Sequence, residues 1–173
     1  MTLEPDQIAA QGKLAFENKK FIEAAEYFRQ AADGYTLSGA ELMAAEMKNN
    51  MSVALLQSGN AQSALDAALG TDQLFEDAKD IKRQGMAVGN QAAALEGLNR
   101  YDEAIAAYER SADLFAQAGE GDLRAMVMKS AAAIKLKMGK LTDSAFKMMG
   151  SLDVKDNPSF LERILKFFLR FIK

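Results

Sequence analysis

Apolar residues recur along this chain at helical spacing, and the whole pattern repeats at a fixed distance. Four stretches superpose at a shift of 40 residues, and the position that they share most clearly is small: Ala24, Ala64, Ala104 and Ser144. A fixed repeat of this length is typical of helical arrays, in which each unit buries its apolar face against its neighbours. The pattern therefore predicts a repeat protein.

The repeat also fixes where small and bulky side chains stand. The shared small position must be small because the second helix of each unit meets the first helix there at close range. Another small residue stands twelve positions earlier in each stretch. Bulky residues flank the shared position in the first, third and fourth stretches, whereas the second has Ala61 and Ala68 there. We expect the aromatic residues of the pattern to fill the core. The small residues are Gly12, Ser52, Ala92 and Ala132, and the aromatic residues are Phe21, Phe28, Tyr35, Phe75, Tyr101, Tyr108 and Phe115.

This pattern predicts an all-α fold, an alpha-alpha superhelix of four antiparallel helix pairs followed by a C-terminal amphipathic helix. The pairs are expected at about 5–38, 39–78, 79–118 and 119–155, and the last helix at 156–173. The second helix of the second pair is expected to run unbroken over about 61–77. In the fourth pair, a turn at Gly139 and Lys140 is expected to separate two helices, because glycine is favoured just past a helix end.

The composition excludes several classes of function but does not identify one. The chain of 173 residues has no cysteine and no histidine, and its net charge is −3. It therefore lacks thiolate and imidazole ligands, a cysteine nucleophile and the commonest general base. The mild negative charge argues against a general nucleic-acid binder. We expect no enzyme activity, no metal or other cofactor, and a cytoplasmic location, since no secretory signal or membrane-spanning apolar run is present.

Residues 90–112 (NQAAALEGLNRYDEAIAAYERSA) and 12–32 (GKLAFENKKFIEAAEYFRQAA) resemble the tetratricopeptide repeat. The resemblance covers about 5–155, and the repeat of 40 exceeds the 34 residues that are usual for the family. It is similar to the longer repeats of kinesin light chains and of the adaptors that orient the mitotic spindle. The resemblance implies a non-catalytic scaffold for protein–protein interaction.

In that family the first helix of each pair lines a concave groove, which implies a set of peptide-binding residues here. Asn50 and Asn90 occupy the same position in their repeats, where long-repeat relatives bind a peptide backbone. An amide both donates and accepts hydrogen bonds, although asparagine could also merely tolerate a wet surface. The small and Met-rich lining favours an apolar or amphipathic peptide. The implied groove residues are Lys13, Phe16, Asn49, Asn50, Val53, Leu56, Met86, Asn90, Ala93, Met126, Lys129, Ser130 and Leu136.

The C-terminal segment is expected to be an amphipathic helix with a wide apolar arc and a basic polar stripe. Three uses remain open: it caps the last repeat, it enters a groove of its own or another copy, or it binds a membrane surface. We expect docking on protein, with homodimer contact as one form of it; the alternative function is a membrane-peripheral or self-associating adaptor. The expected docking residues are Phe160, Leu161, Ile164, Leu165, Phe168, Phe171 and Ile172.

Overall fold

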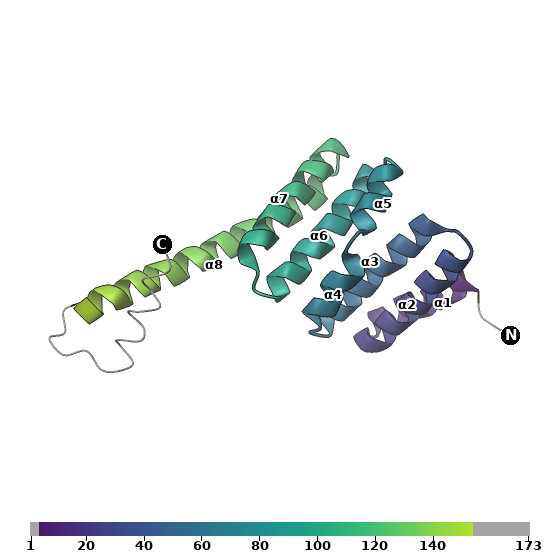
Figure 1. The fold of residues 1–173 in the computed structure, drawn as a ribbon, viewed down its shortest axis with the longest axis horizontal. Helices are drawn as coiled ribbons and strands as arrows, with labels where there is room; N and C mark the ends of the chain where they lie inside the picture. Colours follow the sequence, from purple (N-terminus) through teal and green to yellow (C-terminus); the bar gives the residue numbers. More distant parts are fainter. Residues whose placement is uncertain (1–3, 154–173) are drawn as a thin grey trace. The chain divides into compact units, whose positions relative to one another are not determined.

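The computed structural model describes the backbone of residues 4–153 and the side chains of residues 4–140, and that part of the chain is helical without a strand. The all-α fold is therefore confirmed (Figure 1). In chain order the helices are α1 Pro5–Glu17, α2 Phe21–Leu37, α3 Glu41–Gln57, α4 Ala61–Ala68, α5 Thr71–Asp77, α6 Ile81–Gly97, α7 Tyr101–Gln117 and α8 Gly121–Asp153.

The turns recur every 20 residues, which is half of the sequence repeat. A residue in the left-handed conformation ends a helix at Lys19, Gly39, Gly59, Lys79, Asn99 and Gly119. The following residue then donates its backbone N–H to a carbonyl five positions back, as Asp80 does to Phe75 at 2.9 Å. Such a left-handed residue at a helix C-terminus satisfies carbonyls that have no partner inside the helix. The equal spacing makes the helix pairs stack in register.

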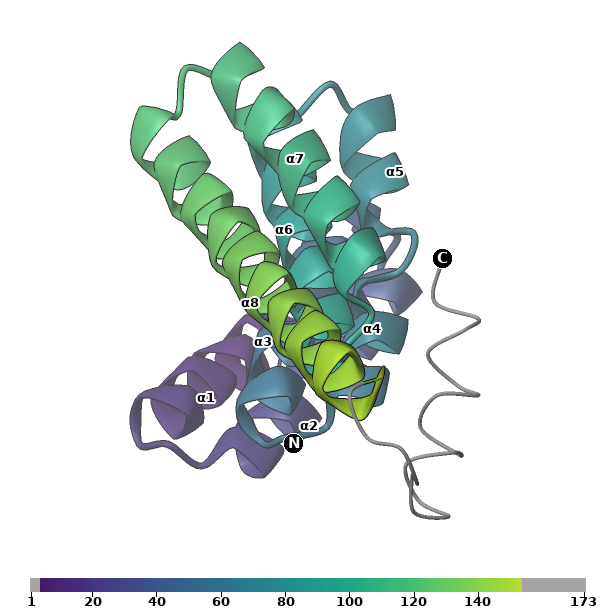
Figure 2. The same ribbon diagram turned by 90° about the vertical axis from the view of Figure 1, so that its left-hand side faces the viewer.

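Contacts between the helices follow chain order, so the array is built from antiparallel neighbours. In the compact unit formed by residues 1–134, α1 packs on α2, α2 on α3, and α6 on α7. Viewed from the side, α1, α3 and α6 form one layer, and α2, α4, α5 and α7 form the other (Figure 2). We call the first set the A helices and the second set the B helices. The first 14 residues of α8, up to Ile134, belong to this unit and take the place of the next A helix.

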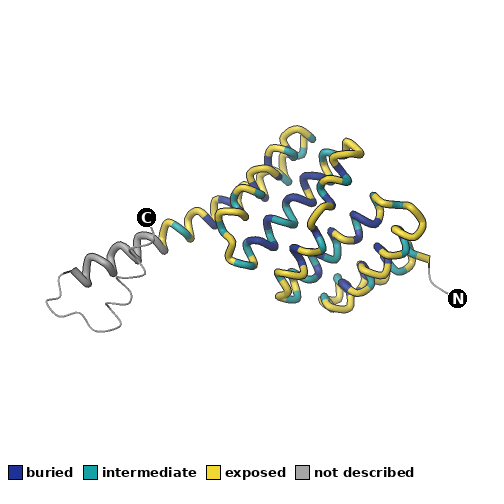
Figure 3. Tube along the Cα trace, in the orientation of Figure 1, coloured by how far each residue is buried: buried dark blue, intermediate teal, exposed yellow. Residues whose placement is uncertain are grey.

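The core lies between the two layers, as the small-residue pattern predicts. Ala24, Ala64 and Ala104 are fully buried with an exposed fraction of 0%, which confirms that helices approach closely there. Buried residues recur along the helix faces that meet (Figure 3). The expected core aromatics are buried at Phe28, Tyr35, Phe75, Tyr108 and Phe115, whereas Phe21 and Tyr101 are half-buried.

The second B helix differs from the expected unbroken helix over 61–77. It divides into α4 and α5 at Leu69 and Gly70, where Gly70 is left-handed with φ +78°. The buried Thr71 hydroxyl lies 2.7 Å from the carbonyl oxygen of Ala68, a group that the break releases from the helix. Because glycine has no Cβ, Gly70 adopts this left-handed conformation at little cost in free energy.

The fourth pair also differs from prediction, because no turn occurs at Gly139 and Lys140. Both residues are helical, and α8 continues to Asp153. The chain divides into a unit of residues 1–134 and a second unit of residues 135–173. The C-terminal amphipathic helix expected at 156–173 lies outside the described residues, as do the side chain of Ser144 and all seven expected docking residues.

Candidate binding groove

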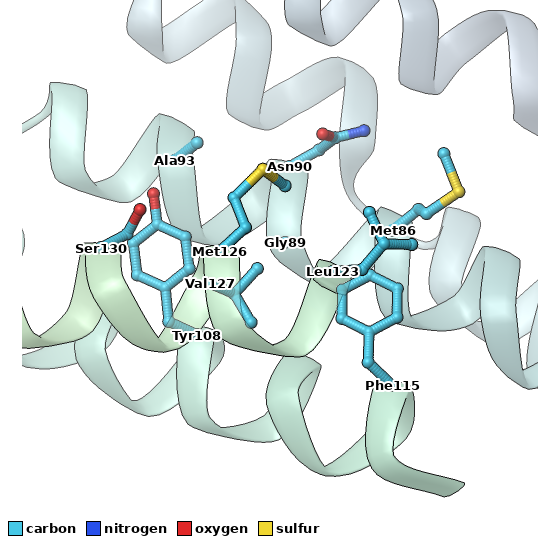
Figure 4. Close-up of a pocket in the computed structure, with 10 residues that line it drawn as sticks. All are labelled: Met86, Gly89, Asn90, Ala93, Tyr108, Phe115, Leu123, Met126, Val127 and Ser130. Atoms are coloured by element: carbon cyan, nitrogen blue, oxygen red, sulfur yellow. The ribbon is translucent and has the colours of Figure 1, made fainter. Parts of the chain in front are cut away.

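A cavity of about 250 Å³ lies where α6 and the first part of α8 meet above α7 (Figure 4). We call it the α6–α8 cavity. No lining side chain is charged, and the lining combines methionines, aromatic rings and small residues. Its lining residues are Met86, Gly89, Asn90 and Ala93 from α6, Tyr108 and Phe115 from α7, and Leu123, Met126, Val127 and Ser130 from α8.

A second cavity, of about 240 Å³, lies at the corresponding place between α1 and α3, and we call it the α1–α3 cavity. Phe28 contributes to its wall as Tyr108 does to that of the α6–α8 cavity, and these two residues are 80 positions apart, which is two repeats. The same shift relates Asn50 to Ser130. The repeat therefore builds the same kind of hollow twice. The lining residues here are Lys13, Phe16, Glu17, Phe28, Asn50 and Val53.

Tyr108 is the most constrained polar group of the α6–α8 cavity. It is 5% exposed, and its hydroxyl donates a hydrogen bond to Glu96 Oε2 at 2.9 Å. Burial raises the pKa of Tyr108 well above its usual value, and the hydrogen bond to the Glu96 carboxylate raises it further. Ser130 also hydrogen-bonds to this hydroxyl, beside which it lies in Figure 4, and opposes the shift. The cavity wall is thus uncharged and held in place from α6 and α8.

Large apolar side chains are exposed at the mouth of the α6–α8 cavity. Met86 is 46% exposed and Met126 is 59% exposed, and the two occupy the same position in successive repeats. An exposed methionine can change its shape to fit different apolar surfaces. The mouth is therefore suited to contact with an apolar side chain.

The two asparagines line different cavities. Asn50 lines the α1–α3 cavity from its later A helix, whereas Asn90 lines the α6–α8 cavity from its earlier A helix. Both side chains are half-buried, and neither amide has a hydrogen-bond partner among the described residues. These amides are available to a ligand, but not as a matched pair within one hollow.

Nine of the thirteen expected groove residues line these two cavities. Asn49 does not: it is 7% exposed, and its Oδ1 lies 3.1 Å from the hydroxyl of Thr71 on α5. Successive helix residues differ by about 100° in direction, so Asn49 and Asn50 cannot both face the groove. Asn49 therefore lies against α5 and lines neither cavity.

Three further expected residues line neither cavity. Leu56 packs beside Gly97, where an added Cβ would lie 3.0 Å from Leu56 Cδ1, so it joins successive A helices. Lys129 and Leu136 are exposed on α8, Leu136 at 61%. Leu136 belongs to the unit of residues 135–173, which is described separately from the unit that carries the cavities.

The B helices contribute cavity residues that the sequence pattern did not predict. Phe28, Tyr108 and Phe115 were expected only in the core, but each also lines a cavity. The sequence held an indication of this, because Phe28 and Tyr108 share a repeat position at which the second repeat has Ala68. Also missed were Glu17, Gly89, Leu123 and Val127.

Comparison of the chain with protein-family models, with curated proteins and with solved structures gave no match. None of the described helices combines the length and the apolar character that crossing a membrane requires. Over the described residues, no three His, Cys, Asp or Glu side chains gather so that they could hold a metal ion. The two cavities are lined by nine of the expected groove residues.

Proposed function

We propose that this chain is a non-catalytic scaffold that binds an apolar or amphipathic peptide segment of another protein along its A helices. The observation that carries the proposal is the repeated hollow, uncharged at α6–α8 and edged by exposed methionines. In this proposal the chain acts in the cytoplasm and is a tetratricopeptide-like protein of the long-repeat type.

The size of the hollows favours side chains as guests. Pockets for small molecules usually enclose roughly 300–1,000 Å³, and each hollow here encloses about 250 Å³ or less. Two such hollows on one surface suit two anchor side chains of one peptide. Apolar anchors repeated along one face are how an amphipathic helix is recognised in a groove.

Polar groups at the hollows suit a peptide backbone or a polar flank. The Asn90 amide has a donor and an acceptor to offer beside the methionines. Lys13 and Glu17 place one charge of each sign at the α1–α3 cavity, so a guest there can carry either charge at its rim. These groups would set the orientation of the peptide, while the apolar contacts would supply most of the affinity.

The test is selection of peptides from a random library of 20-residue segments on the full chain, followed by fluorescence anisotropy with variants. Ala93→Phe should fill the α6–α8 cavity and weaken binding at least about tenfold, which corresponds to about 1.4 kcal/mol. Asn90→Ala should weaken binding less, because it removes only polar contacts. Ala133→Phe is the matched control, since Ala133 holds the same repeat position on α8, is exposed and lies outside the cavity.

Equal binding of the selected peptides to the Ala93→Phe variant and to the unaltered chain would contradict the proposal. Enrichment of no peptide over a surface without protein would contradict it as well. Circular dichroism and thermal unfolding of both variants should show that the fold is retained.

A further inference from the structure

The break in the second B helix is held by side chains from both neighbouring A helices. Ala68 is the last residue of α4, and its carbonyl oxygen accepts hydrogen bonds from two of them. The Thr71 hydroxyl lies 2.7 Å from this oxygen and 3.1 Å from Asn49 Oδ1 on α3. The Gln91 amide on α6 donates to the same oxygen at 3.1 Å. Hydrogen bonds around one carbonyl therefore join α3, the broken B helix and α6.

Asp72 extends this cluster to the third B helix. Gln91 also donates to Asp72 Oδ1 at 2.9 Å, and Asp72 Oδ2 lies 2.9 Å from Arg110 Nη1 on α7. Asn49 and Thr71 are buried, and the side chain of Asp72 is only 15% exposed. We call the set of Asn49, Thr71, Asp72, Gln91 and Arg110 the polar joint. It connects α3, α5, α6 and α7.

The polar joint belongs to the second repeat. The positions of Asn49, Thr71 and Asp72 carry small side chains in the other two repeats. These equivalents are Ala9, Ala31 and Ala32 in the first repeat, and Gly89, Ser111 and Ala112 in the third. The B helices of those repeats, α2 and α7, each run unbroken over 17 residues. Larger polar side chains therefore replace small ones at the one B helix that is broken among these three.

The polar joint lies between the two hollows of the groove. The A helix α3 supplies Asn50 to the α1–α3 cavity, and α6 supplies Asn90 to the α6–α8 cavity. The joint residues Asn49 and Gln91 are the immediate chain neighbours of these two asparagines. A shift of α3 relative to α6 would therefore move one hollow relative to the other.

We infer that the polar joint fixes the distance between the two hollows and thereby selects guest peptides by the spacing of their anchor side chains. This inference rests on the proposed peptide binding. Apolar contacts are not directional, so a purely apolar contact between α3 and α6 would allow several packings. Hydrogen bonds require particular distances and angles, and a buried network whose members are all satisfied specifies one arrangement. No buried side-chain nitrogen or oxygen of the described residues lacks a hydrogen-bond partner.

Distance measurement by electron paramagnetic resonance, on the full chain without peptide, tests whether the joint fixes this distance. Because the chain has no cysteine, nitroxide labels can be attached through Ala10→Cys on α1 and Ala133→Cys on α8. Both positions are exposed, line neither cavity and belong to the unit of residues 1–134. Three A-helix steps separate them, which gives a span of roughly 24–30 Å.

The labelled chain should give one narrow distribution of distances. Adding Thr71→Val and Gln91→Met removes both side-chain donors to the Ala68 carbonyl oxygen, and this double variant should give a shifted or broadened distribution. Gln91→Met alone keeps the Thr71 hydrogen bond and should give a smaller change of the same kind, which serves if the double variant does not fold. An unchanged distribution in both variants would overturn the inference.

Two control variants separate the joint from a general effect of substitution. Gln11→Met is the matched control, since Gln11 holds the repeat position of Gln91 on α1 and is exposed there. Thr71→Ser keeps the hydroxyl that Thr71→Val removes. Both controls should leave the distribution of distances as it is in the labelled chain, and a change as large as that of the double variant would overturn the inference.

Peptides selected on the unaltered chain test the selection by spacing. Inserting two residues between the two anchor side chains should weaken binding to the unaltered chain at least about tenfold, because one apolar side chain no longer reaches its hollow. The same insertion should weaken binding to the double variant by only about threefold or less. Equal losses on both chains would overturn the inference and leave the proposed function standing. Enrichment of no peptide would overturn the proposed function, and the selection by spacing with it.

Discussion

Gly12 on α1 lies so close to Phe28 on α2 that a Cβ atom at Gly12 would stand 2.8 Å from the ring carbon Cε1. Phe28 is 3% exposed and also lines the α1–α3 cavity, so its ring cannot easily move away. One contact therefore both closes the first helix pair and shapes the groove above it.

Gly12→Ala should lower the free energy of unfolding, although alanine favours a helix. The gain in helix propensity is about 1 kcal/mol, but overpacking a close contact costs roughly 1–3 kcal/mol. We expect a net loss of up to about 2 kcal/mol in urea unfolding, as the difference between these two terms. The matched control is Gly121→Ala, where no atom lies within 4 Å of the added Cβ; that variant should be neutral or more stable.

Lys79→Gly should stabilise the chain. Lys79 ends α5 with φ +57°, a conformation that disfavours side chains with a Cβ by roughly 1–2 kcal/mol. Glycine removes this penalty but also raises the conformational entropy of the unfolded chain. We therefore expect the free energy of unfolding to increase by about 0.5–1 kcal/mol. Thermal unfolding measures it, and Gly59→Ala, the reverse change at φ +85°, should lower stability by a similar amount. A lower melting temperature for Lys79→Gly would refute the assignment of strain to this turn.

Alkaline pH should destabilise the fold through Tyr35. The hydrogen bond that its hydroxyl donates to Asp6, together with burial and the negative charges of Asp6 and Glu46, raises its pKa from 10.0 to about 12. Its contribution is complete below the unfolded value of 10.0 and is lost as pH rises towards 12. Unfolding measured between these pH values should show a shallower decline for Tyr35→Phe than for the unaltered chain. An identical slope would mean that the folded state does not hold this proton.

Peptide length should matter in a way that the two hollows dictate. They are two A-helix steps apart, and packed helices are 8–10 Å apart, which gives a span of roughly 16–20 Å. A helical guest therefore needs roughly 11–13 residues to reach both hollows, and an extended one about 5–6. A selected peptide that is shortened from one end should no longer be sensitive to Ala93→Phe, which fills the α6–α8 cavity. A peptide that is shortened from the other end should no longer be sensitive to Val53→Phe in the α1–α3 cavity. Loss of both effects together would argue against two separate anchor sites.

The repeat made most of the fold predictable, because each small position has a local physical reason. Ala24, Ala64 and Ala104 share a phase and are all fully buried. The break at Gly70 was missed because the repeat pattern favours one continuous helix, whereas the released Ala68 carbonyl finds partners in Thr71 and Gln91. Such tertiary compensation is not visible in a periodic pattern.

Gly139 is the opposite case, because a glycine that predicts a turn from the sequence lies inside a helix. Glycine permits a left-handed turn but does not enforce one, and α8 is helical there. Helical spacing singled out Met86, Asn90 and Ala93, which line the α6–α8 cavity, but it could not separate Asn49 from Asn50. Side chains of neighbouring helix residues differ in direction by about 100° around the helix axis, so an error of one residue in the assigned position changes which face the side chain lies on.

Photo-crosslinking tests whether a peptide binds along the A helices. A benzophenone side chain placed at Met86, at the mouth of the α6–α8 cavity, is compared with one at Leu37, which ends the B helix α2 and is 90% exposed. With a peptide selected on the unaltered chain, we expect crosslinks from position 86 that excess unlabelled peptide suppresses, and none above background from position 37. Equal crosslinking at both positions, or crosslinking at position 37 alone, would show that the peptide does not bind along the A helices.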